Sequence, residues 1–233
     1  MYSKAPRHVA IILDGNRRYA KKLGLQSWKG HEFGVKKLKE LLKWCVELGI
    51  KELTLYSFST ENFNRTKTEK DFLFNLFKRE FNNMEHQGDI FKNKIRINVI
   101  GRLDMFPKEI RKAMLSIMEK TRKHGNLVVN FAMAYGGRQE ITDAVKKIAK
   151  NAKEGKINVN DINEKMITAN LYLKSEPDLM IRPGGETRTS NFLTWQSIYS
   201  EWVFASKLWP EFTKKDLESY IKEFNGRERR FGK

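Results

Sequence analysis

Two periods of apolar residues run along the chain, and they predict two kinds of element. Short, nearly continuous apolar runs predict buried strands, and positions that recur every three or four residues predict amphipathic helices. The predicted strands are 9–13, 52–59, 94–101, 126–137, 178–182 and 202–206. The predicted helices are 33–48, 68–85, 107–124, 138–150, 161–171 and 214–224, the second with Thr68 as its N-cap.

Strands that alternate with helices predict an α/β fold with a mostly parallel central sheet, flanked by helices. About six strands are expected. No linker, repeat or low-complexity segment interrupts the pattern, so residues 1–233 are expected to form a single domain.

Composition excludes several classes of protein. With 40% hydrophobic and 12% aromatic residues, the chain can bury a core. No apolar run approaches the roughly 18 residues of a membrane span, and the first residues lack a signal-peptide pattern. The single Cys45, expected to be a core thiol, can form no internal disulfide. We therefore expect a cytoplasmic protein.

A net charge of +17 indicates polyanionic partners, such as nucleic acid, an anionic membrane surface or phosphorylated small molecules. Many lysines, however, lie on helical faces opposite apolar positions, as in VKKLKELLKW. A solvated face explains most of them. The charge by itself does not choose among the three partners.

The residues that follow the predicted strands are more informative, because ligands of parallel α/β sheets bind beyond the carboxyl ends of the strands. Glycines, arginines, hydroxyls and amides gather there. Such residues bind phosphate through backbone N–H groups and guanidinium forks. The four segments are 14–18 (DGNRR), 59–65 (STENFNR), 135–138 (YGGR) and 183–191 (PGGETRTSN).

Asp14 stands among these arginines, where it is either an ion-pair partner of Arg17 or Arg18 or a ligand of Mg²⁺, which takes one or two carboxylates plus phosphate oxygens. Zinc is excluded, because the four histidines show no ligand spacing and there is one cysteine. The sequence has no P-loop motif and no GxGxxG after the first strand.

Six segments of the chain are HVAIILDGNRRYA, Gly30-His31, YSFSTENFNR, YGGR, DLMIRPGGETRTSNFL and NGRERRFG. Taken together, they resemble the cis-prenyltransferases, above all the bacterial undecaprenyl diphosphate synthases. The likeness covers nearly the whole chain, with the motifs in the same order. It implies a homodimeric, Mg²⁺-dependent enzyme that adds isopentenyl diphosphate to an allylic diphosphate, usually farnesyl diphosphate. The expected product is undecaprenyl diphosphate, the carrier lipid of cell-wall synthesis.

The resemblance also assigns roles to residues. Asp14 and Asn62 are the expected catalytic residues, and Asp14 and Glu201 the expected metal ligands. Arg230-Phe231-Gly232 is expected to reach the partner's site in the dimer. The expected substrate-binding residues are Gly15, Asn16, Arg17, Arg18, Tyr19, His31, Ser59, Thr60, Glu61, Phe63, Arg65, Arg182, Arg188, Thr189 and Ser190.

Several positions depart from the family pattern. Arg17 and Tyr19 stand where glycine and tryptophan are usual, Phe63 replaces a tryptophan, and Thr187 replaces a frequent histidine. Ser27 replaces an arginine before Gly-His, so Arg17 or Lys29 could supply that charge. Asn62 is a neutral amide and a poor base near pH 7, so it is interpreted as orienting a substrate or relaying a proton to diphosphate.

The prenyl chain requires an apolar tunnel, and the basic exterior is expected to contact anionic lipid at the inner face of the membrane. Three other functions remain: a nucleic-acid-binding protein, a non-catalytic prenyltransferase subunit, and a phosphohydrolase. The first is disfavoured because the arginines lie at strand ends, and the second because the DGN segment is intact. The third is disfavoured because no DxD pattern follows the first strand. The tunnel candidates are Leu38, Leu42, Leu73, Phe74, Phe77, Met84, Ile97 and Val99.

Overall fold

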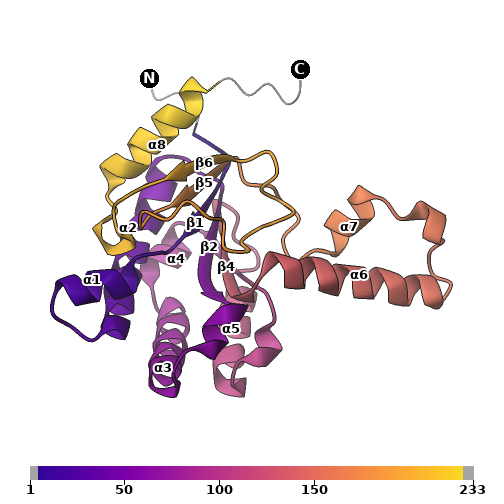
Figure 1. The fold of residues 1–233 in the computed structure, drawn as a ribbon, viewed down its shortest axis with the longest axis horizontal. Coiled ribbons are helices and arrows are strands. Elements are labelled where there is room, and N and C mark those ends of the chain that lie inside the picture. The colour runs from indigo at the N-terminus through magenta and orange to yellow at the C-terminus, as the bar shows by residue number, and fades with distance from the viewer. Residues whose placement is uncertain (1–4, 228–233) are drawn as a thin grey trace.

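Six parallel strands form one sheet, in the order β3-β4-β2-β1-β5-β6 (Figure 1). The computed structural model describes residues 5–227. The predicted α/β fold with about six mostly parallel strands is confirmed. The strands are β1 (His8–Ile12), β2 (Glu52–Ser59), β3 (Ile95–Ile100), β4 (Leu127–Tyr135), β5 (Leu179–Arg182) and β6 (Glu201–Phe204).

The six predicted helices are present, with boundaries that differ by one to four residues in most cases. Two short helices, α1 and α4, were not predicted. The helices are α1 (Asn16–Lys22), α2 (Gly30–Glu47), α3 (Lys67–Met84), α4 (Gly88–Lys92), α5 (Lys108–Lys120), α6 (Gly137–Lys153), α7 (Glu164–Asn170) and α8 (Lys214–Gly226).

Alternate residues of each strand face two different layers, and both layers are apolar. Val9 and Ile11 of β1 belong to the larger core, with residues of α2, α3, α5 and α8. Ala10 and Ile12 face the smaller core, where Phe192 of the loop after β5 packs. Burial on both faces explains why the strands are continuous apolar runs. α6 and α7 extend away from the sheet to one side (Figure 1).

The prediction of Thr68 as the N-cap of α3 is wrong. The cap is Thr66, whose hydroxyl accepts a hydrogen bond from the backbone N–H of Glu69, and Thr68 lies inside the first turn. Both threonines precede the same apolar pattern, so periodicity alone does not distinguish them. Cys45 is fully buried, as expected for a core thiol.

Two further predictions concern membrane-spanning segments and the C-terminal residues. No helix within residues 5–227 is long and apolar enough to cross a membrane. Arg230-Phe231-Gly232, expected to reach a partner's site, lies outside the described residues.

Candidate active site

The carboxyl ends of four neighbouring strands meet along one edge of the sheet. β4, β2, β1 and β5 are consecutive in the sheet, and each is followed by one of the predicted phosphate-binding segments. We call residues 13–18, 59–65 and 182–191 the polar rim. The three segments are far apart in sequence, and the parallel topology brings them together.

Gly15 fixes the path of the chain at the start of α1. Its φ of 102° is left-handed, and a Cβ there would lie 2.9 Å from the Leu208 side chain. Any other residue would be strained by its backbone and crowded by its neighbour. The DGNRR segment, interpreted from the sequence as a turn, is therefore a sharp bend that leads directly into a helix.

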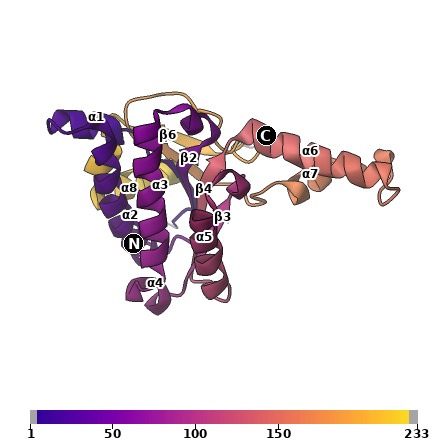
Figure 2. The same ribbon diagram turned by 90° about the horizontal axis from the view of Figure 1, so that it is seen from below.

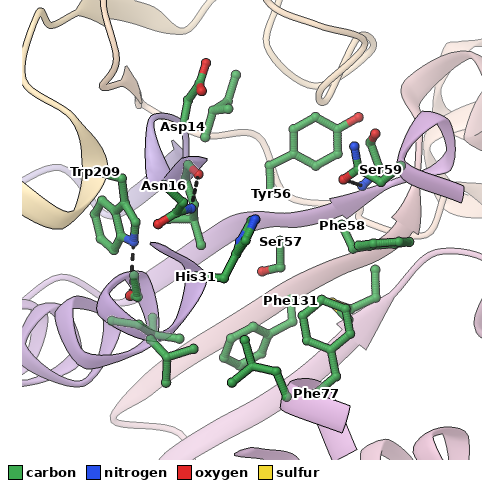
Figure 3. Close-up of a pocket in the computed structure, with 18 of the residues that line it drawn as sticks. Asp14, Asn16, His31, Tyr56, Ser57, Phe58, Ser59, Phe77, Phe131 and Trp209 are labelled. Carbon is green, nitrogen blue, oxygen red and sulfur yellow. Dashed lines mark hydrogen bonds between the residues drawn. The ribbon is translucent and has the colours of Figure 1, made fainter. Parts of the chain in front are cut away.

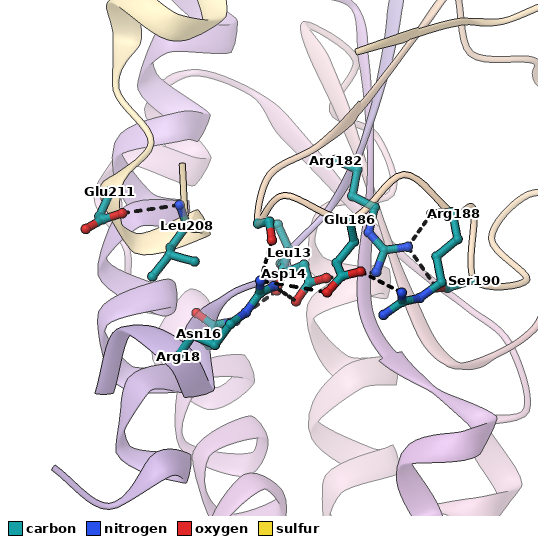
Figure 4. A network of polar contacts seen from close by, with 11 residues as sticks. Leu13, Asp14, Asn16, Arg18, Arg182, Glu186, Arg188, Ser190, Leu208 and Glu211 are labelled. Atoms are coloured by element: carbon teal, nitrogen blue, oxygen red, sulfur yellow. Dashed lines mark hydrogen bonds and ion pairs between the residues drawn. The ribbon is translucent and has the colours of Figure 1, made fainter. Parts of the chain in front are cut away.

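Asp14 lies between two guanidinium groups (Figure 4). Its Oδ1 is 3.1 Å from Arg18 Nη2, and its Oδ2 is 2.8 Å from Arg182 Nη2. The Arg182 side chain is only 4% exposed, so its buried positive charge must be stabilised by nearby negative groups such as Asp14. A diphosphate that entered the rim would find the same guanidinium donors that Asp14 now occupies.

Arg182 also holds the loop that follows β5. Its Nη1 donates to Ser190 Oγ at 2.8 Å and to the carbonyl oxygen of Arg188. Glu186 accepts a hydrogen bond from Arg188 at 2.6 Å and lies 3.9 Å from Arg18 (Figure 4). Carboxylates thus alternate with arginines along the rim. This arrangement reduces the repulsion among the guanidinium groups before an anion binds.

Glu69, on the first turn of α3, is a site residue that sequence reasoning missed. It is buried, accepts a hydrogen bond from Arg65 at 2.8 Å, and lies 3.7 Å from Arg17. The pattern Thr66-x-x-Glu69 is typical of a capping box, in which the glutamate returns to the N-cap backbone. Here the carboxylate contacts the two arginines instead. The T-x-x-E pattern just after Arg65 was the signal available in the sequence.

The segment after β2 is folded tightly by its own polar groups. The backbone N–H of Ser59 donates to Asn62 Oδ1 at 3.1 Å, which closes a capping box around Thr60–Asn64. Burial alone would raise the pKa of Glu61, but hydrogen bonds from its own backbone and from Ser59 and Asn191 lower it. The hydrogen bond from Ser59 holds the Asn62 amide in one orientation, and its role towards a substrate stays a prediction.

His31 is kept neutral by its surroundings. Burial, together with the nearby charges of Arg65 and Arg17, lowers its pKa from 6.5 to about 3. Its Nε2 lies 3.4 Å from Arg65 Nη1, and its ring points into the cavity near Asn16 and Ser57 (Figure 3). A neutral imidazole at this position can donate a hydrogen bond to an anion without adding charge.

A cavity of about 670 Å³ opens at the polar rim and continues between the helices and the sheet. Asp14, Arg65, Arg182 and Arg188 line its mouth. Apolar residues of α2, α3, β2 and β4 line the rest; Figure 3 shows Phe58, Phe77 and Phe131 among them. A narrower hollow of about 400 Å³ adjoins the mouth and contains Arg17, Arg18 and Lys21. The site therefore combines a cationic mouth with an apolar interior.

Half of the predicted tunnel residues lie on this cavity. Leu38, Leu42, Phe77 and Met84 line it. The others belong to the surrounding core and do not face it: Leu73, Phe74, Ile97 and Val99.

Some predicted site residues do not line either hollow. Tyr19 packs edge-on against Phe33, and Phe63 packs among Phe58, Phe74 and Phe106. The remaining residues in this group are Thr60, Thr189 and Glu201. The others predicted at the site line one or both hollows: Asp14, Gly15, Asn16, Arg17, Arg18, His31, Ser59, Glu61, Asn62, Arg65, Arg182, Arg188 and Ser190.

Glu201 is not brought together with Asp14 in this chain. It begins β6 and pairs with Leu179 at the amino end of β5, whereas Asp14 follows the carboxyl end of β1. Its carboxylate accepts a hydrogen bond from Arg227 at 2.6 Å. A shared metal site with Asp14 thus finds no support within one chain, and that role of Glu201 stays a prediction.

The residues at the mouth fit a magnesium ion brought in with a diphosphate. Within residues 5–227 no group of three His, Cys, Asp or Glu side chains could hold a metal by itself. Asp14 is a single partly exposed carboxylate among phosphate-binding groups, and Mg²⁺ commonly uses one such ligand with phosphate oxygens and water.

Comparison with known proteins identifies the family. The model of the family described as "Putative undecaprenyl diphosphate synthase" matches residues 12–232. The chain belongs to this family of cis-prenyltransferases. A relative from Thermococcus kodakarensis, named tritrans,polycis-undecaprenyl-diphosphate synthase (geranylgeranyl-diphosphate specific), is 50% identical over 230 residues, which are 98% of this chain and 87% of the relative. The resemblance seen in the sequence is confirmed.

Solved structures of family members share the fold. Lavandulyl diphosphate synthase from Lavandula x intermedia, in complex with dimethylallyl diphosphate, matches with a TM-score of 0.94 at 35% identity, over 98% of this chain and 99% of that one. A probable undecaprenyl diphosphate synthase from Campylobacter jejuni matches at 0.82 and 38%, over 99% and 100% of the two chains.

Proposed function

We propose that the protein condenses isopentenyl diphosphate with an allylic diphosphate to make a long-chain cis-polyprenyl diphosphate. The observation that carries the proposal is the cavity that is cationic at its mouth and mostly apolar in its interior. Substrates with a diphosphate head and a prenyl tail match both parts. Nucleic acid would match the mouth alone.

The two ends of the rim suit two diphosphates. In keeping with the family resemblance, we assign the allylic diphosphate to residues 15–18, His31 and Arg65. The second diphosphate is assigned to Arg182, Arg188 and Ser190, which the loop after β5 holds together. Fixing both substrates on one rim supplies the proximity that a bimolecular condensation needs.

Asp14 is the residue that would hold Mg²⁺, together with phosphate oxygens. When bound, the ion would act as a Lewis acid that stabilises negative charge on the leaving diphosphate. Arg17, Arg18 and Arg65 stabilise the same charge through their guanidinium groups. Because this charge grows as the allylic C–O bond breaks, these contacts favour the transition state over the ground state.

The remaining steps are assigned to groups beside the mouth. The double bond of isopentenyl diphosphate attacks the allylic carbon, and a proton leaves the neighbouring carbon. Asn62, fixed by its hydrogen bond from Ser59, orients a substrate or relays the proton to a diphosphate oxygen. The neutral His31 donates a hydrogen bond to the allylic diphosphate.

We further propose geranylgeranyl diphosphate as the preferred primer, in place of the farnesyl diphosphate expected from the sequence. The relative that is 50% identical to this chain carries geranylgeranyl-diphosphate specificity in its name. Undecaprenyl diphosphate is proposed as the product on the same basis. Its use in cell-wall synthesis, a homodimer and contact with anionic lipid remain predictions.

An extension assay tests the proposal. Purified protein is incubated with radiolabelled isopentenyl diphosphate, Mg²⁺ and, in parallel, dimethylallyl, farnesyl or geranylgeranyl diphosphate, and products are sized by chromatography. We expect a polyprenyl ladder that EDTA abolishes, with the highest kcat/KM for geranylgeranyl diphosphate. Equal or better use of farnesyl diphosphate would contradict the primer assignment, and no extension of any primer would contradict the function.

A further inference from the structure

The wall of the cavity between α2 and α3 is built differently from its other walls. Both helices start near the polar rim and run along the same side of the sheet (Figure 2). Val35, Leu38 and Leu42 line the cavity from α2, and Phe77 and Phe81 from α3. The cavity therefore lies between the two helices.

Ion pairs join the two helices across this cavity. Lys39 Nζ lies 3.1 Å from Glu80 Oε2, and Arg79 Nη2 lies 3.6 Å from Glu32 Oε1. Lys39 and Glu80 themselves line the cavity, among the apolar side chains. We call this pair the α2–α3 ion pair. It places two opposite charges in a wall that otherwise contacts a prenyl chain.

Glu80 is poorly suited to this place on grounds of stability. Its side chain is 13% exposed. Its Oε1 accepts a hydrogen bond from Arg79 at 3.0 Å, whereas its Oε2 accepts none from the described residues although Lys39 lies within ion-pair distance. A partly buried carboxylate loses hydration, and an apolar pair of similar size often stabilises such a position at least as well. Stability alone therefore does not account for charges here.

The expected product requires an opening in one wall. α2 is about 27 Å long at 1.5 Å per residue, and the cavity has about 670 Å³. An extended chain of eleven prenyl units is longer than this helix. Its distal end must leave the cavity while the diphosphate stays at the rim.

The α2–α3 ion pair is the part of the wall that opens at the least cost. Lys39 is 45% exposed, so its ammonium group regains water when the pair separates, and Glu80, which is 13% exposed, keeps its hydrogen bond from Arg79. Partly exposed ion pairs contribute little to stability. Separating packed apolar helices would instead expose hydrophobic surface to water.

On the basis of the proposed function, we propose that the α2–α3 ion pair is a lateral gate for the growing prenyl chain, and that its strength sets the product length. While the gate is closed, the chain fills the cavity and further elongation is opposed. When the pair separates, the distal end passes between the helices and elongation continues. A weaker pair therefore gives longer products.

Charge reversal tests the gate. Glu80→Lys and Lys39→Glu each turn the attraction into repulsion, and Glu80→Gln removes it at nearly constant size. We expect each single reversal to shift the main product to longer chains by at least one prenyl unit, and Glu80→Gln to shift it less. The double variant Lys39→Glu, Glu80→Lys restores the attraction between these two positions but removes the carboxylate that pairs with Arg79, and it should return the distribution towards that of the wild type.

Lys43→Glu is the matched control. Lys43 lies one turn along α2 and pairs with Asp89 at 3.2 Å, but it does not line the cavity. The same charge change there should leave product length unaltered. The rate of the first condensation with dimethylallyl diphosphate, measured in every variant, reports folding and the rim separately. Lys39 lies eight residues beyond His31 in α2, about 12 Å along the helix axis, which is further than a five-carbon chain extends.

The outcomes separate the gate from the underlying function. Wild-type extension establishes the function by itself. Unchanged product lengths in both single reversals would then overturn the gate. A shift that the double variant fails to reverse would overturn it as well, because the effect would not depend on the pairing of these two charges.

Discussion

The two ends of the cavity hold their ligands by different physics. At the mouth, arginines such as Arg182 are fixed by carboxylates and carbonyl oxygens, so each donor has a defined position. In the interior, Phe77, Phe81 and Phe131 offer apolar surface without defined direction. The mouth therefore positions the reacting diphosphates, and the interior accepts a chain whose length changes at every cycle.

This difference predicts that substitutions at the mouth change rates, whereas substitutions in the interior change products. Asp14→Ala should have the largest effect, a loss of about 10²–10³ in kcat, because it removes an electrostatic partner of the transition state. Asp161→Ala, at an exposed position of the 3₁₀ helix between α6 and α7, away from the sheet (Figure 1), is the control. Steady-state kinetics with saturating Mg²⁺ measure both. Near-normal turnover of Asp14→Ala would refute its assignment.

Glu69→Gln should have the next largest effect. Without the carboxylate, Arg65 and Arg17 repel each other, and their positions at the allylic diphosphate are lost. We expect KM for the allylic substrate to rise about tenfold, the equivalent of about 1.4 kcal/mol, with a smaller change in kcat. Glu109→Gln, at an exposed position of α5, should leave KM unchanged. An unaltered KM in Glu69→Gln would show that Glu69 does not position the two arginines for the substrate.

A substitution in the interior should act on product length. Met84→Phe adds volume on the lining, and we expect the main product to shorten by one or more prenyl units. Leu73→Phe adds volume to the adjacent core instead, where overpacking typically costs about 1–3 kcal/mol. Thermal melts and product chromatography distinguish the two. If Leu73→Phe shortened the product as much as Met84→Phe, the boundary between lining and core would be placed wrongly.

Acidification should have the smallest consequence for this difference between mouth and interior, because it acts on the free energy of unfolding. His31 is neutral in the folded protein, with a pKa lowered to about 3, whereas in the unfolded chain it binds a proton below about 6.5. The unfolded state thus binds more protons, so the free energy of unfolding falls as the pH falls from about 6.5 towards 3, by at most about 1.4 kcal/mol per unit from this residue. Urea unfolding at pH 7 and pH 5 should show a smaller loss for His31→Asn than for the wild type. Equal losses would contradict the assignment.

The mouth was largely predictable from the sequence, and the interior was not. A parallel topology places strand ends together, so Asp14, Arg65 and Arg182 could be grouped from the strand pattern and the family motifs. Leu73 and Phe77 are both apolar and, four residues apart, share one face of α3, yet only Phe77 lines the cavity. Their positions along the helix relative to the sheet decide this, and the sequence pattern does not show them. Glu69 was missed because its pattern is also that of a capping box.

The most direct test of the account is a crystal structure with a non-hydrolysable thio-analogue of the allylic diphosphate, isopentenyl diphosphate and Mg²⁺. The account predicts the allylic diphosphate against residues 15–18 and Arg65, and its prenyl tail between α2 and α3. The second diphosphate should lie against Arg182 and Ser190. A prenyl tail outside the cavity, or both diphosphates away from the rim, would contradict the central claim.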